Sequence, residues 1–439
     1  MTIKEYLENH REEMIDFLTE LVAVRSIQKI DFLAELVAVR SFQDKLDGVY
    51  PFGKEPAKAL EIMLEKCKES GFTVENVENY VGTADFNDTE PALAILTHLD
   101  VVPEGTGWHS DPYVLKRSEG RLIGRGTCDD KGACVSALFA LKALRELNIP
   151  LKRGVRLIFG TNEENGSADL AYYRKNHELP PMVFTPDGQY PVINAEKGMI
   201  RVYFSAPCFD DLIIVSEKII NAVPEKCVAS YGNRKFSCTG KSGHASTPEK
   251  AENAITKFLE EFTKEFKNPL LCRLAELFPH GETDGKSCGL GFSDDISGKM
   301  TCVLSMLNAN KVAGLKGGID IRFPLDRTFD EISGIICKSL ENAGFKIDLC
   351  EGTEPHITDE NSEFVQSLLR VYERVTGDKG YCIAIGGGTY VHEIEGGVAF
   401  GAEFPNENGN MHGADEFITE ENLLKNAEIM AEAIIEICG

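Results

Sequence analysis

The stretch Leu-Ala-Ile-Leu-Thr-His-Leu-Asp-Val-Val-Pro, from Leu93 to Pro103, decides the fold of this chain. Its first part is a continuous run of apolar and β-favouring residues, a pattern typical of a parallel strand that is covered on both faces. Proline ends the run, and the carboxyl end of such a strand is where α/β folds place ligands. The stretch therefore predicts a buried strand with His98 and Asp100 at its functional end.

His98 and Asp100 stand two residues apart, so their side chains leave the same face of a strand. At a strand end this pair serves either as a metal ligand with the carboxylate that orients it or as one half of a charge network. A core histidine that is simply paired with an aspartate has the same sequence. This stretch alone leaves these alternatives open.

The composition is typical of a globular protein with more than one domain. The chain has 439 residues, of which 43% are hydrophobic, and this length favours two domains over one core. The 70 acidic and 46 basic residues give a formal charge of -24, which repels phosphate backbones and anionic membranes. We therefore expect no nucleic-acid or membrane partner, whereas carboxylate metal ligands suit this charge.

Cysteine usage and the N-terminus predict the compartment. The 13 cysteines are odd in number and contain no Cys-x-x-Cys pair, so we expect reduced thiols. The chain opens on Met1 without the pattern of a secretory signal, and no apolar run reaches the ~18 to 20 residues of a membrane span. These features predict a soluble, cytoplasmic protein.

The N-terminal segment contains a repeat. Residues 3–25 have the apolar spacing of one amphipathic helix, and residues 15–28 recur as residues 30–43 with two differences. In a continuous helix this offset turns the second apolar face by roughly 60° from the first, so the two copies cannot dock alike. The repeat is either a local duplication tolerated near a terminus or a surplus face that contacts a partner.

The rest of the first half alternates between strand and helix patterns. We expect helices at 55–70 and 133–147, strands at 72–77, 92–97, 155–159 and 182–184, and a hairpin whose strands, 113–116 and 121–124, flank Glu119-Gly120. This order predicts an α/β fold with a mixed, mainly parallel sheet that is flanked by helices.

Acidic residues gather at the ends of the expected strands and at the start of one helix. They are Asp100 beside His98, the pair Glu163 and Glu164, Asp187, and the pair Asp129 and Asp130. In a parallel sheet such ends lie side by side, so the carboxylates would repel one another unless cations held them. One or two divalent metals explain the pattern better than separate helix caps or solvated loop ends.

In these residues the chain resembles metallopeptidase family M20, and most closely its branch of PepV-like bacterial dipeptidases. The resemblance covers nearly the whole chain and rests on motifs in the family's order: His98-x-Asp100-Val-Val-Pro, Gly-Arg-Gly-x-x-Asp129-Asp130-Lys-Gly, Glu163-Glu164, Asp187, Gly386-Gly387-Gly388-Thr389-Tyr390 and Met411-His412-Gly413-Ala414-Asp415-Glu416-Phe417. Each motif is short, but the ordered set is specific.

The resemblance implies a site for two divalent metal ions, with zinc favoured over manganese or cobalt. His98 and Asp187 would bind one ion, Glu164 and His412 would bind the other, and Asp129 would bridge them. Each ion then has one nitrogen and two oxygen ligands, a set that zinc accepts.

The resemblance also implies catalytic roles for two residues beside the ligands. Asp100 would orient His98, and Glu163 would act as the general base that takes a proton from the bridging water and passes it to the leaving amine. The peptide bond between Asp129 and Asp130 is expected to be cis.

Residues 196–355 change pattern and resemble the family's inserted α+β lid domain, so the catalytic domain would comprise residues 1–195 and 356–439. Within the lid, His244 would stabilise the oxyanion, and Arg322 would hold the terminal carboxylate of the substrate. The glycine loop, through Gly387, Gly388 and Thr389, would add backbone N–H groups to that carboxylate site, although an ordinary glycine turn has the same sequence.

The resemblance therefore implies a metal-dependent dipeptidase that acts on dipeptides, as a monomer or as a homodimer formed through the lid. Within the same family, an N-acyl-amino-acid deacylase or desuccinylase shares the metal ligands and differs in its lid contacts. A catalytically silent metal-binding or peptide-binding protein is the alternative from another class, and the intact Glu163 disfavours it.

Overall fold

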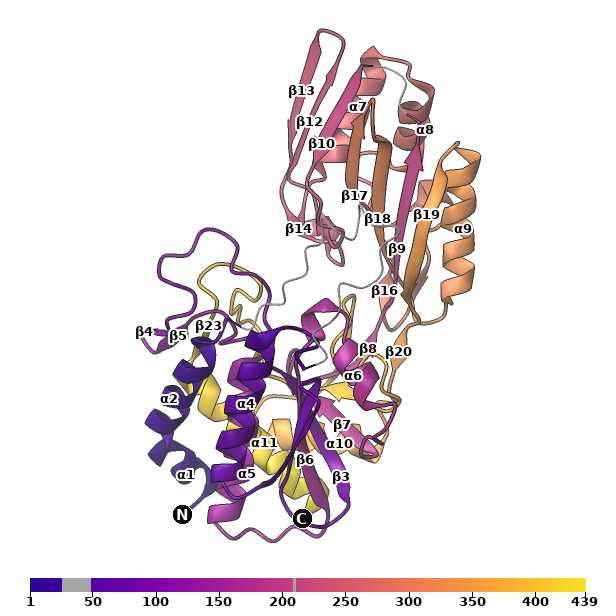
Figure 1. The fold of residues 1–439 in the computed structure, drawn as a ribbon. Coiled ribbons are helices and arrows are strands. Elements are labelled where there is room, and N and C mark those ends of the chain that lie inside the picture. The colour runs from indigo at the N-terminus through magenta and orange to yellow at the C-terminus, as the bar shows by residue number, and fades with distance from the viewer. Residues whose placement is uncertain (26–48, 208–210) are drawn as a thin grey trace. The chain divides into compact units, whose positions relative to one another are not determined.

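The computed structural model describes residues 1–25, 49–207 and 211–439. They form two compact units (Figure 1). Unit 1 comprises Met1–Asn194, Thr358–Ile383 and Thr389–Gly439, and unit 2 comprises Ala195–Ile357 and Ala384–Gly388. The second copy of the repeat, residues 30–43, lies outside the described residues. That unit 2 acts as a lid inserted at 196–355 stays a prediction.

Unit 1 is built on a mixed sheet with the order β1-β2-β6-β3-β7-β22-β8-β20, in which β21 also pairs with β8. Its strands are β1 (Thr73–Val77), β2 (Val81–Asp85), β3 (Pro91–His98), β6 (Gly154–Gly160), β7 (Met182–Thr185), β8 (Val192–Glu196), β20 (His356–Ile357), β21 (Cys382–Ile385) and β22 (Val398–Ala399). A separate small sheet has the order β23-β5-β4 and consists of β4 (Lys116–Ser118), β5 (Arg121–Ile123) and β23 (Phe417–Thr419).

Parallel pairing is confined to the centre of the large sheet. β6, β3, β7 and β22 pair in parallel, whereas β1, β2, β8 and β20 join through antiparallel pairings. The expectation of a mixed sheet is confirmed, but "mainly parallel" is wrong. The reason at one edge is a tight turn, since Glu78 and Asn79 both have positive φ and reverse the chain directly from β1 into β2.

Both faces of β3 are buried, as its apolar run predicts. Leu93 and Ile95 pack into one hydrophobic cluster, and Ala94 and Leu96 pack into another on the opposite face. The first cluster includes side chains of α1 (Ile3–Asn9), α2 (Arg11–Val22), α4 (Lys54–Glu69), α5 (Lys131–Glu146), α10 (Glu363–Thr376) and α11 (Glu420–Cys438), and the second includes side chains of α6 (Ala168–Tyr173).

Two further expectations need correction. The helix expected over 3–25 breaks at His10. The ring Nδ1 of His10 lies 2.8 Å from the carbonyl oxygen of Tyr6, so the side chain hydrogen-bonds a main-chain acceptor of the helix. The hairpin around Glu119 and Gly120 forms, with positive φ at both residues, but its first strand is Lys116–Ser118 instead of 113–116.

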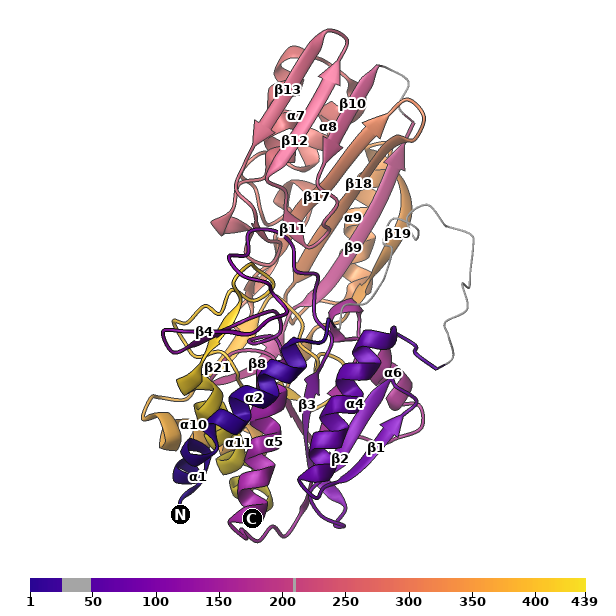
Figure 2. The ribbon, with the colours of Figure 1, turned by 60° about the vertical axis from the view of Figure 1, so that its left-hand side comes forward.

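Unit 2 is an α+β unit, as expected. Its seven-stranded sheet has the order β13-β12-β10-β17-β18-β9-β19, and the helices lie on one face of it (Figure 2). The strands are β9 (Gly198–Ala206), β10 (Leu212–Ser216), β12 (Lys226–Tyr231), β13 (Arg234–Thr239), β17 (Thr301–Asn310), β18 (Gly314–Phe323) and β19 (Lys346–Thr353), and the helices are α7 (Ala254–Glu265), α8 (Pro269–Leu277) and α9 (Phe329–Asn342). Two small ribbons pair β11 (Ala222–Val223) with β14 (Gly243–His244) and β15 (Ser293–Asp294) with β16 (Gly298–Lys299).

All cysteines in the described part of the chain are free thiols. In that same part, none of the helices combines the length and the apolar character that crossing a membrane requires.

Candidate active site

The carboxyl ends of three neighbouring parallel strands carry the predicted residues. His98 is the last residue of β3, which lies between β6 and β7. Glu163 and Glu164 open the short 3-10 helix η1 (Glu163–Asn165) just after β6, and Asp187 follows β7 by two residues. Because these strands run in parallel, their side chains meet at one edge of the sheet.

Five of the predicted residues form two groups that share Asp129. In the first group, Nε2 of His98 lies 3.0 Å from Oδ1 of Asp129 and 3.6 Å from Oδ2 of Asp187. In the second group, Nε2 of His412 lies 2.8 Å from Oδ2 of Asp129 and 3.2 Å from Oε2 of Glu164. Each group offers one nitrogen and two carboxylates, and the two oxygens of Asp129 face different groups.

His98 is held in a way that leaves one ring nitrogen for a cation. Its Nδ1 lies 3.0 Å from the carbonyl oxygen of Asp100, so Nδ1 carries a hydrogen and, in the neutral ring, Nε2 has the lone pair. Nε2 is buried and makes no aligned hydrogen bond within the described residues. A buried imidazole nitrogen without such a bond, facing two carboxylates, fits a metal ligand.

The electrostatics of both groups favour a bound positive charge. Burial, followed by the charge of Asp129, raises the pKa of Glu164 to about 7 and also raises the pKa of Asp187. Burial acts to lower the pKa of His412, but hydrogen bonds that its ring donates to Asp129 and Glu164 outweigh burial and raise the pKa to about 11. Without cations, these shifts favour proton binding to Glu164, Asp187 and the two imidazoles, and divalent ions would replace those protons.

The carboxylate of Asp100 faces the two glutamates more closely than it faces the imidazole. Its two oxygens accept the main-chain N–H groups of Glu163 and Glu164 at 3.1 and 3.2 Å, whereas Oδ1 is 3.5 Å from Nδ1 of His98. Asp100 thus contacts His98 mainly through its carbonyl oxygen, and it anchors the start of η1 through its carboxylate.

Glu163 lies next to a candidate ligand but belongs to neither group. Burial raises its pKa well above the usual value for a glutamate, and the charge of Asp187 adds to that shift. Bound cations would neutralise the neighbouring carboxylates that repel a charge on Glu163. A carboxylate in this environment has the properties of a general base.

The segment between β5 and α5 presents Asp129. The peptide bond between Asp129 and Asp130 is cis, as the family resemblance implies. Oδ2 of Asp130 accepts the main-chain N–H of His98 at 3.1 Å. The carboxyl group of Asp130, which the sequence left without a role, therefore joins this segment to the end of β3.

In unit 2, the ring of His244 contacts Ser246 through Nδ1, which lies 2.6 Å from the hydroxyl oxygen of Ser246. Its Nδ1 accepts the main-chain N–H of Ser246 at 3.2 Å, so the neutral imidazole carries its hydrogen on Nε2. This is the tautomer that donates a hydrogen bond from Nε2, as an oxyanion stabiliser must.

The predicted carboxylate-binding elements of unit 2 contact one another. Arg322 is buried on β18 and donates from one terminal nitrogen to the carbonyl oxygen of Gly386 at 3.1 Å. Its other nitrogens bond both oxygens of Asp320, at 2.6 and 3.1 Å. A side chain at Gly386 would press on Ser246, because a Cβ there would lie 2.9 Å from the Cβ of Ser246. The glycine loop therefore lies against both the Arg322 side chain and the turn that carries His244.

Sequence reasoning missed a network that holds the end of β6. Oδ2 of Asp169 accepts the N–H groups of Thr161 and Asn162 at 2.6 and 2.9 Å and the hydroxyl hydrogen of Tyr390 at 2.6 Å. The ring of Tyr390 also packs edge-on against His98, 6.2 Å between centroids. Tyr390 ends the glycine motif, but nothing in the sequence indicates that its hydroxyl bonds a buried aspartate.

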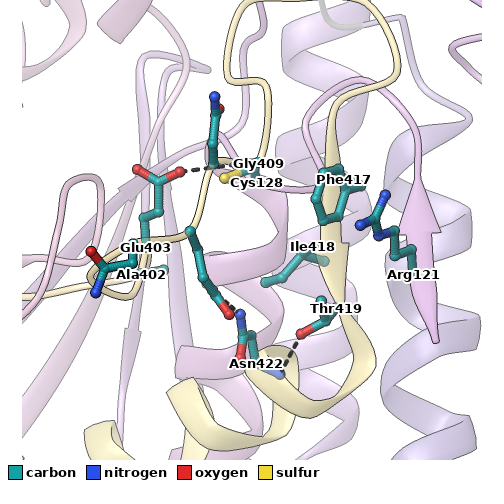
Figure 3. A pocket seen from close by; sticks show the side chains of 12 residues that line it. Arg121, Cys128, Ala402, Glu403, Gly409, Phe417, Ile418, Thr419 and Asn422 are labelled. Atoms are coloured by element: carbon teal, nitrogen blue, oxygen red, sulfur yellow. Dashed lines mark hydrogen bonds between the residues drawn. The ribbon is translucent and has the colours of Figure 1, made fainter.

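A cavity of about 300 Å³ lies next to the Asp129 segment, but the candidate metal ligands do not line it. Figure 3 shows Cys128, Gly409 and Phe417 among the residues that line it. Burial raises the pKa of the Cys128 thiol, and the charge of Glu416 adds to that shift. This cavity is therefore separate from the candidate metal ligands.

The chain resembles known proteins along most of its length. Residues 94–436 match peptidase family M20/M25/M40. It is 31% identical over 428 residues to a putative dipeptidase, YtjP, of Bacillus subtilis, with 88% of this chain and 92% of that protein covered. It is 30% identical over 484 residues to the Beta-Ala-Xaa dipeptidase of Lactobacillus delbrueckii subsp. lactis, with 100% and 98% covered.

Solved structures share the fold at low sequence identity. Human carnosine dipeptidase 1 superposes with a TM-score of 0.65 at 16% identity, covering 99% of this chain and 98% of that one. The di-peptidase Dug1p of Saccharomyces cerevisiae superposes with a TM-score of 0.63 at 13% identity, with the same coverage.

Proposed function

Because this chain belongs to peptidase family M20/M25/M40, we propose that it is a dipeptidase that uses two divalent metal ions. The observation that carries the proposal is the pair of donor groups that share Asp129. Each group has one imidazole and two carboxylates, and the shared residue turns one oxygen to each. The arrangement suits two neighbouring ions better than one.

We assign His98 and Asp187 to one ion, Glu164 and His412 to the other, and Asp129 to both. Zinc is the proposed metal because it accepts nitrogen and oxygen ligands in low coordination numbers and leaves a position open. Bound divalent ions supply an acidified water and a positive charge beside the scissile carbonyl.

Glu163 is the proposed general base. It takes a proton from the attacking water and returns it to the amine that leaves as the peptide bond breaks. Asp100 places Glu163 by accepting its main-chain N–H at 3.1 Å. The position of the base therefore depends on a residue that does not touch the substrate.

The substrate-binding roles fall to residues of unit 2 and of the glycine loop. His244 donates from Nε2 to the oxyanion, with its tautomer set by Ser246. Arg322 pairs with the terminal carboxylate of the dipeptide, and the loop through Gly387, Gly388 and Thr389 offers backbone N–H groups to the same carboxylate. A site that recognises a free carboxylate next to the scissile bond restricts cleavage to the last peptide bond of the substrate, which in a dipeptide is its single peptide bond.

The dipeptide is proposed as the substrate because relatives that match nearly the whole chain are named dipeptidases. An N-acyl-amino-acid deacylase or desuccinylase would use the same ligands. A panel of dipeptides, N-acetyl amino acids and N-succinyl amino acids separates these activities by kcat/KM. Turnover of the acylated amino acids alone would replace the dipeptidase assignment.

Glu163→Gln tests the mechanism. We expect kcat to fall by roughly 10² to 10⁴, the usual contribution of a general base, while two metal ions per chain remain bound, because Glu163 belongs to neither donor group. Metal content by mass spectrometry and dipeptide hydrolysis are measured on the same sample.

The matched control is Glu178→Gln, which removes an exposed carboxylate from unit 1 and is expected to keep full activity. Normal turnover by metal-loaded Glu163→Gln would refute the general-base role. Absence of turnover and of metal binding in the unmodified protein would refute the dipeptidase assignment itself.

A further inference from the structure

We propose that Glu416 is a positioning residue that fixes the main chain of the bridging Asp129 and thereby sets the affinity of the metal centre. This inference rests on the proposed function. Glu416 follows His412 by four residues and belongs to neither donor group.

The side chain of Glu416 holds the Asp129 segment by its main chain. Oε1 accepts the N–H groups of Cys128 at 2.9 Å and Asp129 at 3.1 Å. The carbonyl oxygen of Glu416 also accepts the N–H of Gly124 at 2.9 Å and the hydroxyl hydrogen of Thr127 at 3.3 Å. One residue thus binds both ends of the segment from Gly124 to Asp129.

Arg125 holds Glu416 in that position. The two form a fully buried ion pair through Oε2 of Glu416, which leaves Oε1 to the two amides. The guanidinium also donates to the carbonyl oxygens of Pro103 and Glu104, both at 3.4 Å, and of Gly413 at 3.1 Å. Its carbon lies 5.3 Å from the ring centroid of Trp108.

These contacts connect three chain segments that carry candidate ligands. Arg125 joins the segment after His98 to the segment around His412, and Glu416 joins the latter to Asp129. A bridging ligand has to present its two oxygens to two ions at once, so a small shift of its main chain changes both sites. Residues that orient metal ligands typically alter metal affinity or activity by ~10- to 100-fold when they are replaced.

Two double variants isolate the acceptor role of Glu416 from its charge. Arg125→Met with Glu416→Gln removes both charges and keeps an oxygen for the amides of Cys128 and Asp129. Arg125→Met with Glu416→Leu removes the oxygen as well. Since both double variants lose the other contacts of Arg125 equally, their difference reports the carboxamide whose oxygen can accept from the two amides.

The measurement is titration of each metal-free protein with Co²⁺, followed by visible absorption, and then steady-state hydrolysis of a dipeptide. We expect the leucine double variant to bind Co²⁺ ~10- to 100-fold more weakly than the glutamine double variant and to show an altered absorption spectrum. At saturating metal its kcat falls, while KM changes less than about threefold. A role in stability alone would leave the spectrum of the loaded protein unchanged.

Asp85→Asn is the control, because it breaks the ion pair of Asp85 with Arg156 in the same unit without touching a candidate ligand. It is expected to keep the Co²⁺ affinity. Equal affinities and spectra for the two double variants would overturn the proposal. Should the leucine double variant fail to fold, Glu416→Asp replaces it, because this change shortens the side chain by one carbon and keeps the charge. A Co²⁺ affinity of Glu416→Asp equal to that of the unmodified protein would also overturn the proposal. Failure of the unmodified protein to bind Co²⁺ would count against the proposed function instead.

Discussion

At the scale of single residues, the carboxylate of Asp100 serves two adjacent main-chain amides, those of Glu163 and Glu164. One belongs to the proposed base and the other to a candidate ligand. Carboxylate oxygens suit this position because both accept, and hydrogen bonds to a charged group are stronger than those between neutral groups. The spacing in His98-x-Asp100 predicts a shared face but does not show that Asp100 faces η1.

Asp100→Asn is expected to lower kcat by roughly 10- to 100-fold while the protein stays folded. The side-chain NH₂ would face one of the two main-chain N–H groups, so η1 has to shift and Glu163 moves with it. The measurement is kcat on a metal-saturated sample, with circular dichroism to follow folding. Unchanged kcat with full metal occupancy would contradict the role of Asp100 as the anchor of η1.

The candidate ligands could be named from the sequence because each stands in a short motif at a strand end or a helix start. Their supporting residues could not, because Glu416 and Arg125 are 291 positions apart in the chain. Only the fold brings these two residues together. Asp320 likewise looks like any strand residue until the structure shows both its oxygens on Arg322.

At the scale of elements, Asp169 joins the end of β6 to the first turn of α6. Its carboxylate accepts the main-chain N–H groups of Thr161 and Asn162 and the hydroxyl of Tyr390. Burial, followed by the charge of Asp100, raises the pKa of Asp169 from 3.8 to about 6. The ionised form of Asp169 is therefore less favourable in the folded protein than in the unfolded chain.

This shift predicts how stability depends on pH. Because the pKa is raised on folding, the folded state binds more protons between pH 3.8 and about 6. The contribution of Asp169 is thus fully present below pH 3.8 and is lost as pH rises through about 6. Relative to Asp169→Asn, the unfolding free energy of the unmodified protein should fall by on the order of 3 kcal/mol between pH 4 and 7.

Urea unfolding of both metal-free proteins at several pH values measures this difference, and titrating groups far from position 169 cancel because the two proteins share them. A difference that is constant with pH would show that Asp169 has an ordinary pKa.

The sequence predicts the central elements better than the edges of the sheet. β3, β6 and β7 are apolar runs that are followed by candidate site residues, so both the strands and their ends can be predicted from the sequence. β2 is short and contains Gly82, whose lack of a side chain lets Leu60 and Leu64 of α4 approach. That approach is a tertiary requirement, and β-propensity gives no sign of it.

At the scale of the whole molecule, the two units have separate hydrophobic cores, and all five candidate metal ligands belong to unit 1. Ligands that bind only the folded state stabilise it by mass action, by ~2.7 kcal/mol for each site at 100 times Kd. Metal should therefore stabilise unit 1 and leave unit 2 unaffected.

Calorimetry with and without a chelator tests this expectation. Chelation should lower the unfolding transition of unit 1 by at least ~5 °C and leave the transition of unit 2 in place, with activity lost and then restored by Zn²⁺. A single transition that shifts as a whole would show that the units unfold together. Equal thermograms in both conditions would mean that no metal is bound.

Unit 2 is formed by two segments of the chain, the long segment Ala195–Ile357 and the five-residue segment Ala384–Gly388. Gly386, in the short segment, contacts both Arg322 and Ser246. Unit 2 is therefore not a single continuous insertion. If only the long segment of unit 2 were exchanged between related proteins, the new surroundings of Arg322 would meet the original glycine loop. We therefore expect that an engineered exchange of unit 2 has to change the two segments together.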